Sequence, residues 1–162
     1  MTGVQTCALP IYDPETLPLL KDRARSDASQ VVRRAAMQEL ARGWWNDAET
    51  LPLLKDRARS DENEDVRLAA VQELARGWKD DPETLPLLKD RTRSDKNEWV
   101  RLTALRELAR GWKDHPETLL LLKDRAHSDE SEDVRQAAVS ELARGWKGDP
   151  ETRAFLEEHR QA

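Results

Sequence analysis

The stretch that decides the fold of this chain is Asp65-Val66-Arg67-Leu68-Ala69-Ala70-Val71-Gln72-Glu73-Leu74-Ala75-Arg76-Gly77-Trp78. Close copies of it recur every 34 residues, over residues 32–44, 100–112 and 134–146. A fixed period of this length is typical of stacked supersecondary units, each too small to bury its own apolar face. The sequence therefore predicts a repeat protein, and every other feature is interpreted within that repeat.

Each repeat contains two helical patterns, as the unit at residues 47–80 shows. The first pattern covers about residues 48–59, where leucines recur at helical spacing. Asp47 precedes it and is the predicted N-cap, since a short polar side chain accepts hydrogen bonds from the first free backbone N–H groups. Pro52 lies inside the pattern and lacks a backbone N–H. We therefore predict that this helix bends at Pro52 or begins slightly later.

The second helical pattern begins at Asn63, a residue type that favours the N-cap position. Capping residue types occupy the same place in the other units: Ser29, Asn97 and Ser131. Apolar side chains then follow at a spacing of four, which places them on one face of a helix. This predicted buried stripe consists of Val66, Ala70 and Leu74.

A Gly-Trp pair closes each second helical pattern, as at Gly77 and Trp78. Glycine directly after the last apolar position is typical of a left-handed helix C-cap, so we predict that conformation at Gly77. The tryptophans at this place are predicted to pack between units: Trp44, Trp78, Trp112 and Trp146.

Stacked helix pairs of this kind bury a single continuous core. The sequence therefore predicts an all-α fold, a right-handed α-solenoid of antiparallel helix pairs. The predicted units are residues 13–46, 47–80, 81–114 and 115–148, followed by a capping helix at 149–162.

The pattern Asp61, Val66-Arg67, Ala70 and Leu74 resembles the HEAT repeat family. It is most similar to the short HEAT-like repeats of phycobilisome lyases. The resemblance implies a ladder in which aspartate and arginine side chains link adjacent repeats. On the matching positions the ladder residues are Asp27, Arg33, Asp61, Arg67, Asp95, Arg101, Asp129 and Arg135.

The first residues do not fit the repeat. Residues 1–11 resemble the translation of a short-read sequencing adapter, so residues 1–12 are expected to be a disordered leader foreign to the fold. On this interpretation Cys7 carries no redox information, and the chain is a C-terminal fragment of a larger bacterial protein. An apolar flank near Leu17, Leu19 and Leu20 would then lie exposed where an upstream repeat had covered it.

Composition excludes several classes of function. The formal net charge of -5 argues against a general nucleic-acid partner, which would require a basic surface. No apolar run reaches the roughly 18 residues of a membrane span, and no signal peptide is apparent, so we expect a cytoplasmic protein. The histidines lack metal-ligand spacing and no glycine-rich phosphate loop is present. We therefore predict no cofactor, no metal and no enzymatic activity.

Places that differ between units form a stripe along the second helices. The spacing of three and then four puts them on one helix face, and variable places in repeat proteins often face a partner. The candidate partner-binding residues are Asp65, Leu68, Gln72, Trp99, Leu102, Arg106, Asp133 and Gln136. Lys55 and Lys89, on the first helices, are expected to lie on the opposite side. The alternative is that the variable places are simply solvated and free to drift.

Three functions fit these patterns. The first is a non-catalytic scaffold that binds a protein or peptide. The second is the sensor arm of a signalling NTPase whose catalytic domain lies upstream. The third, a bilin-lyase-type enzyme that holds a chromophore, has the least support because no residue pattern places a reactive group against a ligand.

Overall fold

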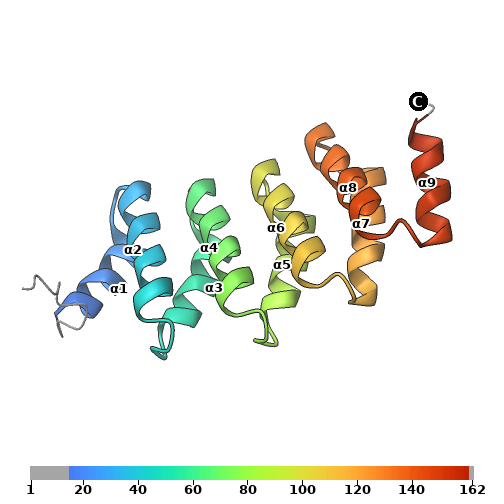
Figure 1. The fold of residues 1–162 in the computed structure, drawn as a ribbon. Helices are drawn as coiled ribbons and strands as arrows, with labels where there is room; N and C mark the ends of the chain where they lie inside the picture. The colour runs from blue at the N-terminus through green and yellow to red at the C-terminus, as the bar shows by residue number, and fades with distance from the viewer. Residues whose placement is uncertain (1–14, 161–162) are drawn as a thin grey trace, which may run out of the picture.

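The computed structural model describes residues 15–160, and every regular element in that range is an α-helix (Figure 1). Short connections separate the helices. In chain order they are α1 (Thr16–Ser26), α2 (Gln30–Gly43), α3 (Thr50–Ser60), α4 (Glu64–Gly77), α5 (Thr84–Ser94), α6 (Glu98–Gly111), α7 (Pro116–Ser128), α8 (Glu132–Gly145) and α9 (Pro150–Arg160).

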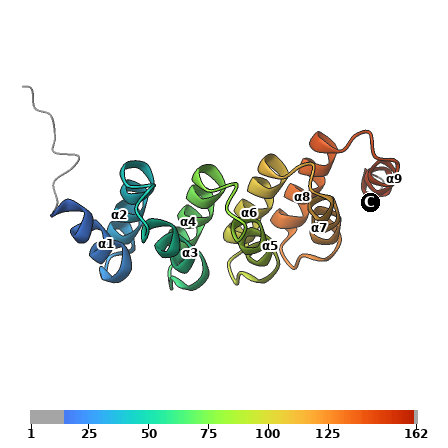
Figure 2. The same ribbon diagram turned by 90° about the horizontal axis from the view of Figure 1, so that it is seen from below.

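The helices stack as antiparallel pairs, α1 with α2 through α7 with α8, in one row along the molecule (Figures 1 and 2). Odd-numbered helices form one layer and even-numbered helices form the other. Neighbouring even-numbered helices are in closer contact than neighbouring odd-numbered helices. This arrangement confirms the predicted all-α solenoid of stacked helix pairs.

The core runs between the two layers and through the boundaries of the repeats. The predicted stripe of Val66, Ala70 and Leu74 is fully buried. Each tryptophan that follows a helix-ending glycine is partly buried and packs against the core, as predicted for packing residues. Burial between units explains why a single pair of short helices needs its neighbours.

The ends of the helices follow the predicted signals in part. Asn63 is the N-cap of α4, and its Oδ1 accepts a hydrogen bond from the backbone N of Asp65 at 2.9 Å. The prediction for Asp47 is wrong, because Glu49 occupies the N-cap position of α3. Asp47 instead caps the preceding turn, where its Oδ1 accepts from the backbone N of Glu49 at 3.0 Å. The helix begins at Thr50, so Pro52 lies in its first turn, where its missing N–H leaves no bond unmade.

The prediction of a left-handed cap at Gly77 is also wrong. Within the described residues, no glycine has a positive φ. Gly77 is the last residue of α4, and the backbone N of Trp78 donates to the carbonyl of Leu74 at 3.0 Å. The chain then leaves the helix at Trp78 with φ -131°, which needs no left-handed residue. The predicted leader at 1–12 lies outside the described residues.

Candidate recognition surface

The ladder residues meet across the boundaries between repeats. Arg67 donates from Nε to one carboxylate oxygen of Asp95 and from Nη2 to the other, both at 2.9 Å. Arg33 with Asp61 and Arg101 with Asp129 form the same two-bond pair. Each pair joins the second helix of one repeat to the end of the first helix of the next.

Within a repeat, the arginine contacts the backbone of its aspartate rather than the carboxylate. Arg67 Nη1 donates to the carbonyl of Asp61 at 2.8 Å. One guanidinium therefore holds its own loop and the loop of the next repeat. Because its donors and its charge are satisfied internally, it is a structural group rather than a site for a ligand.

The electrostatics of Asp61 follow from this geometry. Burial alone would raise the pKa of Asp61, because it disfavours the charged carboxylate. Hydrogen bonds from Arg33 and from the backbone N of Asn63 outweigh burial and hold the pKa below its ordinary value. The carboxylate therefore stays ionised in the buried boundary.

A second row of ion pairs links the first helices. Lys55 Nζ lies 2.7 Å from Asp81 and 3.2 Å from Glu83, at the start of the next repeat. Lys21 and Lys123 likewise pair with an aspartate and a glutamate of the next segment. Lys89 pairs with Glu117, since His115 stands where the other repeats have the aspartate. The sequence reasoning missed this row, although a lysine recurs in all four units with a glutamate 28 positions later and, in three of them, an aspartate 26 positions later. Lys55 and Lys89 are therefore buried structural residues.

The structure separates the candidate partner-binding residues into three groups. Trp99 is 51% exposed, and the other exposed candidates are Asp65, Arg106, Asp133 and Gln136. Leu68 and Gln72 are half-buried. Leu102 is only 5% exposed and packs in the core, so its side chain is not available to a partner. The stripe is thus exposed in the first turns of α4, α6 and α8 and again at Arg106 and Gln136, and it is covered at Leu68, Gln72 and Leu102.

The backbone beneath Trp99 is fixed while its ring is exposed. Asn97, the N-cap of α6, accepts hydrogen bonds from the backbone N of Trp99 at 2.9 Å and of Val100 at 3.3 Å. The neighbouring Glu98 accepts a hydrogen bond from the hydroxyl of Ser131 in the next repeat. A cavity of 420 Å³ lies beside these groups, lined by Lys96, Asn97, Glu98, Arg101, Glu130 and Ser131. The backbone that carries the exposed ring of Trp99 is therefore held by its N-cap, and the two residues before Trp99 line a polar cavity.

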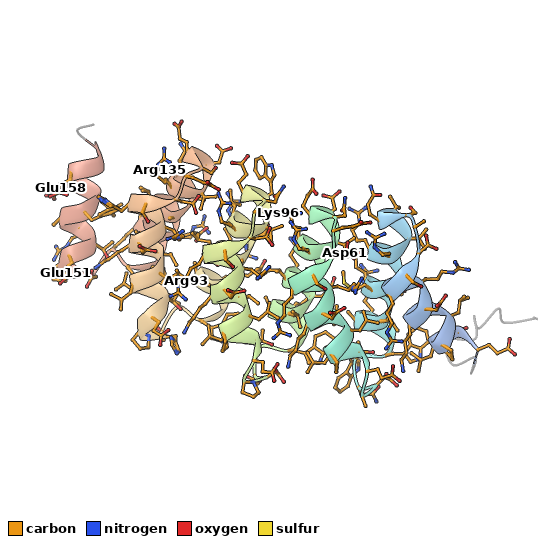
Figure 3. All side chains as sticks on the ribbon, turned by 180° about the vertical axis from the view of Figure 1, so that it is seen from behind. Asp61, Arg93, Lys96, Arg135, Glu151 and Glu158 are labelled. Atoms are coloured by element: carbon orange, nitrogen blue, oxygen red, sulfur yellow. The ribbon has the colours of Figure 1, made fainter. Side chains whose placement is uncertain are left out.

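Three further polar clefts lie between successive repeats, with volumes of 350, 270 and 320 Å³. They line one edge of the stack, toward which Asp61, Lys96 and Arg135 lie in Figure 3. Ser60 lines the first two clefts, and its hydroxyl donates to the carbonyl of Asp56 at 2.9 Å. The serines at this edge therefore bond to their own helices.

In the part of the chain that the structure describes, no three side chains of the metal-ligating types gather into a group that could hold an ion. None of the helices described is long and apolar enough to cross a membrane. The polar groups described above are the ladder, the lysine row and the clefts between successive repeats.

The fold defines a helical repeat scaffold, a class that typically lacks catalytic activity. The family model for HEAT repeats matches residues 17–109 and 91–162, and the chain belongs to this family. No curated protein and no solved structure matches the chain.

Proposed function

We propose that this protein is a non-catalytic scaffold that binds a protein or peptide through the exposed starts of its second helices. The observation that carries the proposal is Trp99, which is half exposed on a backbone fixed by Asn97. Tryptophan is enriched among the residues that dominate binding energy at interfaces. A fixed backbone limits the loss of conformational freedom on binding.

The contrast between recurring buried positions and variable exposed positions supports the same function. The ladder, the lysine row and the apolar stripe recur in every unit, and in the two inner units they are buried or ion-paired within the stack. Variable places such as Asp65, Trp99 and Asp133 are exposed. The scaffold can therefore keep its fold while the exposed places change, which is how repeat proteins acquire partners.

The test is binding by a double variant, Trp99→Ala with Arg106→Ala. Both side chains are exposed on α6, seven positions apart, and so lie on one face. We expect the variant to bind the partner at least tenfold more weakly, because truncating such anchors typically costs ~2 kcal/mol or more. The first step is a pull-down from a host lysate, followed by affinity measurement with the captured protein in purified form.

The matched control is Leu120→Ala with Arg93→Ala, which removes an exposed apolar side chain and an exposed arginine from the first-helix layer. It should bind like the original chain. Lys55 and Lys89 are unsuitable controls because their ion pairs hold the stack together. If both double variants capture the same proteins with equal affinity, the second-helix surface is not the binding surface.

The two other functions stay hypotheses. A role as the sensor arm of a signalling NTPase predicts a catalytic domain in the uninterrupted upstream reading frame. A bilin-lyase-type activity predicts a spectral change when the protein is titrated with a bilin.

A further inference from the structure

The N-terminal end of the stack exposes an apolar surface. The equivalent surface of each other repeat is buried. Leu19 on α1 is 53% exposed, whereas its counterparts Leu53, Leu87 and Leu121 are 4%, 4% and 2% exposed. Those counterparts are buried where each repeat meets the repeat before it. Leu19 is therefore exposed at a place that is covered in each of the other three units.

The second-helix layer shows the same difference. Val32 on α2 is 39% exposed, whereas Val66, Val100 and Val134 at the same place are fully buried. Leu19 and Val32 come from the two helices of one pair, so the uncovered surface extends over both layers. The places it includes are the ones that are buried at the next three boundaries.

A carboxylate, that of Asp27, lies at the same end of the stack as the apolar surface. Asp61, Asp95 and Asp129 each accept two hydrogen bonds from the arginine of the preceding repeat. Asp27 occupies the same place, and its carboxylate pairs with the exposed Arg23 at 3.1 Å and accepts from the backbone N of Ser29 at 2.9 Å. It receives no guanidinium from another repeat among the described residues.

The arginine four residues before each ladder aspartate shows a second difference between the first repeat and the repeats that follow. Arg57 Nη1 donates to the carbonyl of Arg25, and Arg91 Nη1 donates to the carbonyl of Arg59, at 3.1 and 3.3 Å across the boundary. Both side chains are largely buried. Arg23, at the same place, is half exposed. A first helix stacked ahead of α1 would supply Arg23 with the backbone carbonyl that Arg57 and Arg91 receive from their preceding repeats.

We propose that this face is the docking site for one further helix pair of the same pattern, joined ahead of α1, whose second helix carries an arginine that reaches Asp27. Three kinds of contact fit that occupant: apolar cover for Leu19 and Val32, a guanidinium for Asp27 and a carbonyl for Arg23. A second copy of the chain does not fit. At its other end α9 lies where the next first helix would stack, held by ion pairs from Lys123 to Asp149 and Glu151 at 3.1 and 3.0 Å.

The test extends the full chain by inserting a second copy of residues 47–80 directly before Asp13, which preserves the period of 34. In this register the copied Arg67 faces Asp27. Hydrogen exchange of the amides in α1 and α2 is compared between the original and the extended chain. We expect it to slow by about tenfold or more in the extended chain, because terminal elements without a packed neighbour open most easily.

The matched control is the same insertion with Arg67→Gln in the copy, which should lose most of this protection. A second comparison needs no insertion. In the original chain, Asp27→Asn should shift the urea unfolding midpoint much less than Asp61→Asn, because only Asp61 holds a guanidinium from another repeat. In the extended chain, Asp27→Asn should become as damaging as Asp61→Asn.

Several results would overturn the proposal. The extended chain could show no added helical signal in circular dichroism, or unchanged exchange in α1 and α2. Asp27→Asn could destabilise the original chain as much as Asp61→Asn. The original chain could sediment as a dimer that Leu19→Lys dissociates, in which case a second copy is the occupant.

Discussion

The guanidinium of Arg67 and the carboxylate of Asp95 form a two-bond ion pair across a repeat boundary, and their side chains are 3% and 1% exposed. Arg67→Met would leave this carboxylate without its main partner. Since breaking a buried pair on one side typically costs about 3–5 kcal/mol, we expect a fall in the free energy of unfolding of that order. Urea unfolding followed by circular dichroism measures it.

Arg135→Met is the matched control for Arg67→Met. Arg135 donates to the carbonyls of Asp129 and Glu130 in its own repeat, and no carboxylate of another repeat pairs with it among the described residues. We expect a loss of about 1 kcal/mol, as for ordinary hydrogen bonds. Equal losses for the two variants would show that the inter-repeat pair adds nothing to stability.

The lysine row should make the protein sensitive to acid. A hydrogen bond from Lys55 holds the pKa of Asp81 below its ordinary value of 3.8, and Lys21 does the same for Asp47. Because the folded pKa is the lower one, the unfolded chain binds more protons as the pH falls. The stabilisation is therefore complete above pH 3.8 and is lost as the pH drops below it.

Unfolding in urea at several values between pH 7 and pH 3 measures this loss. Lys55→Met should reduce the loss, since Asp81 then titrates nearer its ordinary range. The same pH dependence in the original chain and in Lys55→Met would contradict a role for this ion pair.

A charge at Val66 should be far more damaging than the same charge at Val32. Val66 is fully buried, whereas Val32 occupies the same place in the first repeat and is partly exposed. An unpaired buried charge is among the few severe mechanisms available to a point mutation. We expect Val66→Asp to lower the free energy of unfolding by about 4 kcal/mol or more, and Val32→Asp by about 1 kcal/mol.

Gln72→Ala, on the variable stripe of α4, is a second control and should change the free energy of unfolding by no more than ~0.5 kcal/mol. Similar losses for all three variants would mean that the buried stripe is wrongly assigned.

The repeated threonines at the start of the first helices should respond in opposite directions. Thr84 is fully buried, and its hydroxyl has no hydrogen-bond partner among the described residues. Thr152 holds the same place in α9, but its hydroxyl donates to Asp149 at 2.7 Å. We expect Thr84→Val to raise the free energy of unfolding by up to about 1 kcal/mol and Thr152→Val to lower it by about 1 kcal/mol. A thermal melt of each variant is sufficient, and a loss in Thr84→Val would show that its hydroxyl is satisfied.

Much of the fold could be predicted because the repeat presents each signal four times. The spacing of Val66, Ala70 and Leu74 predicts the buried face, and packing confirms it. The backbone conformation at the end of α4 was less predictable than its buried face. Glycine at position 77 permits a left-handed residue, but the bond from Trp78 to Leu74 closes the helix without one.

The recognition surface was less predictable than the fold. Variation between units identified Trp99, which is exposed, but also Leu102, which is buried against the next repeat. Sequence variation does not separate an exposed place from a buried place that accepts several apolar side chains. The role of Lys55 was missed because its acidic partners lie in the next repeat. The three-dimensional stack brings Asp81 to 2.7 Å and Glu83 to 3.2 Å from the lysine.

The two layers of the stack differ in how they are joined, and this difference has a mechanical consequence. Apolar packing joins neighbouring even-numbered helices, while neighbouring odd-numbered helices are in looser contact and are linked by the lysine row. Apolar contact resists separation at any ionic strength, whereas partly exposed ion pairs weaken as salt screens them. We therefore expect the stack to bend about the layer of even-numbered helices, and the layer of odd-numbered helices to separate more easily as the salt concentration rises.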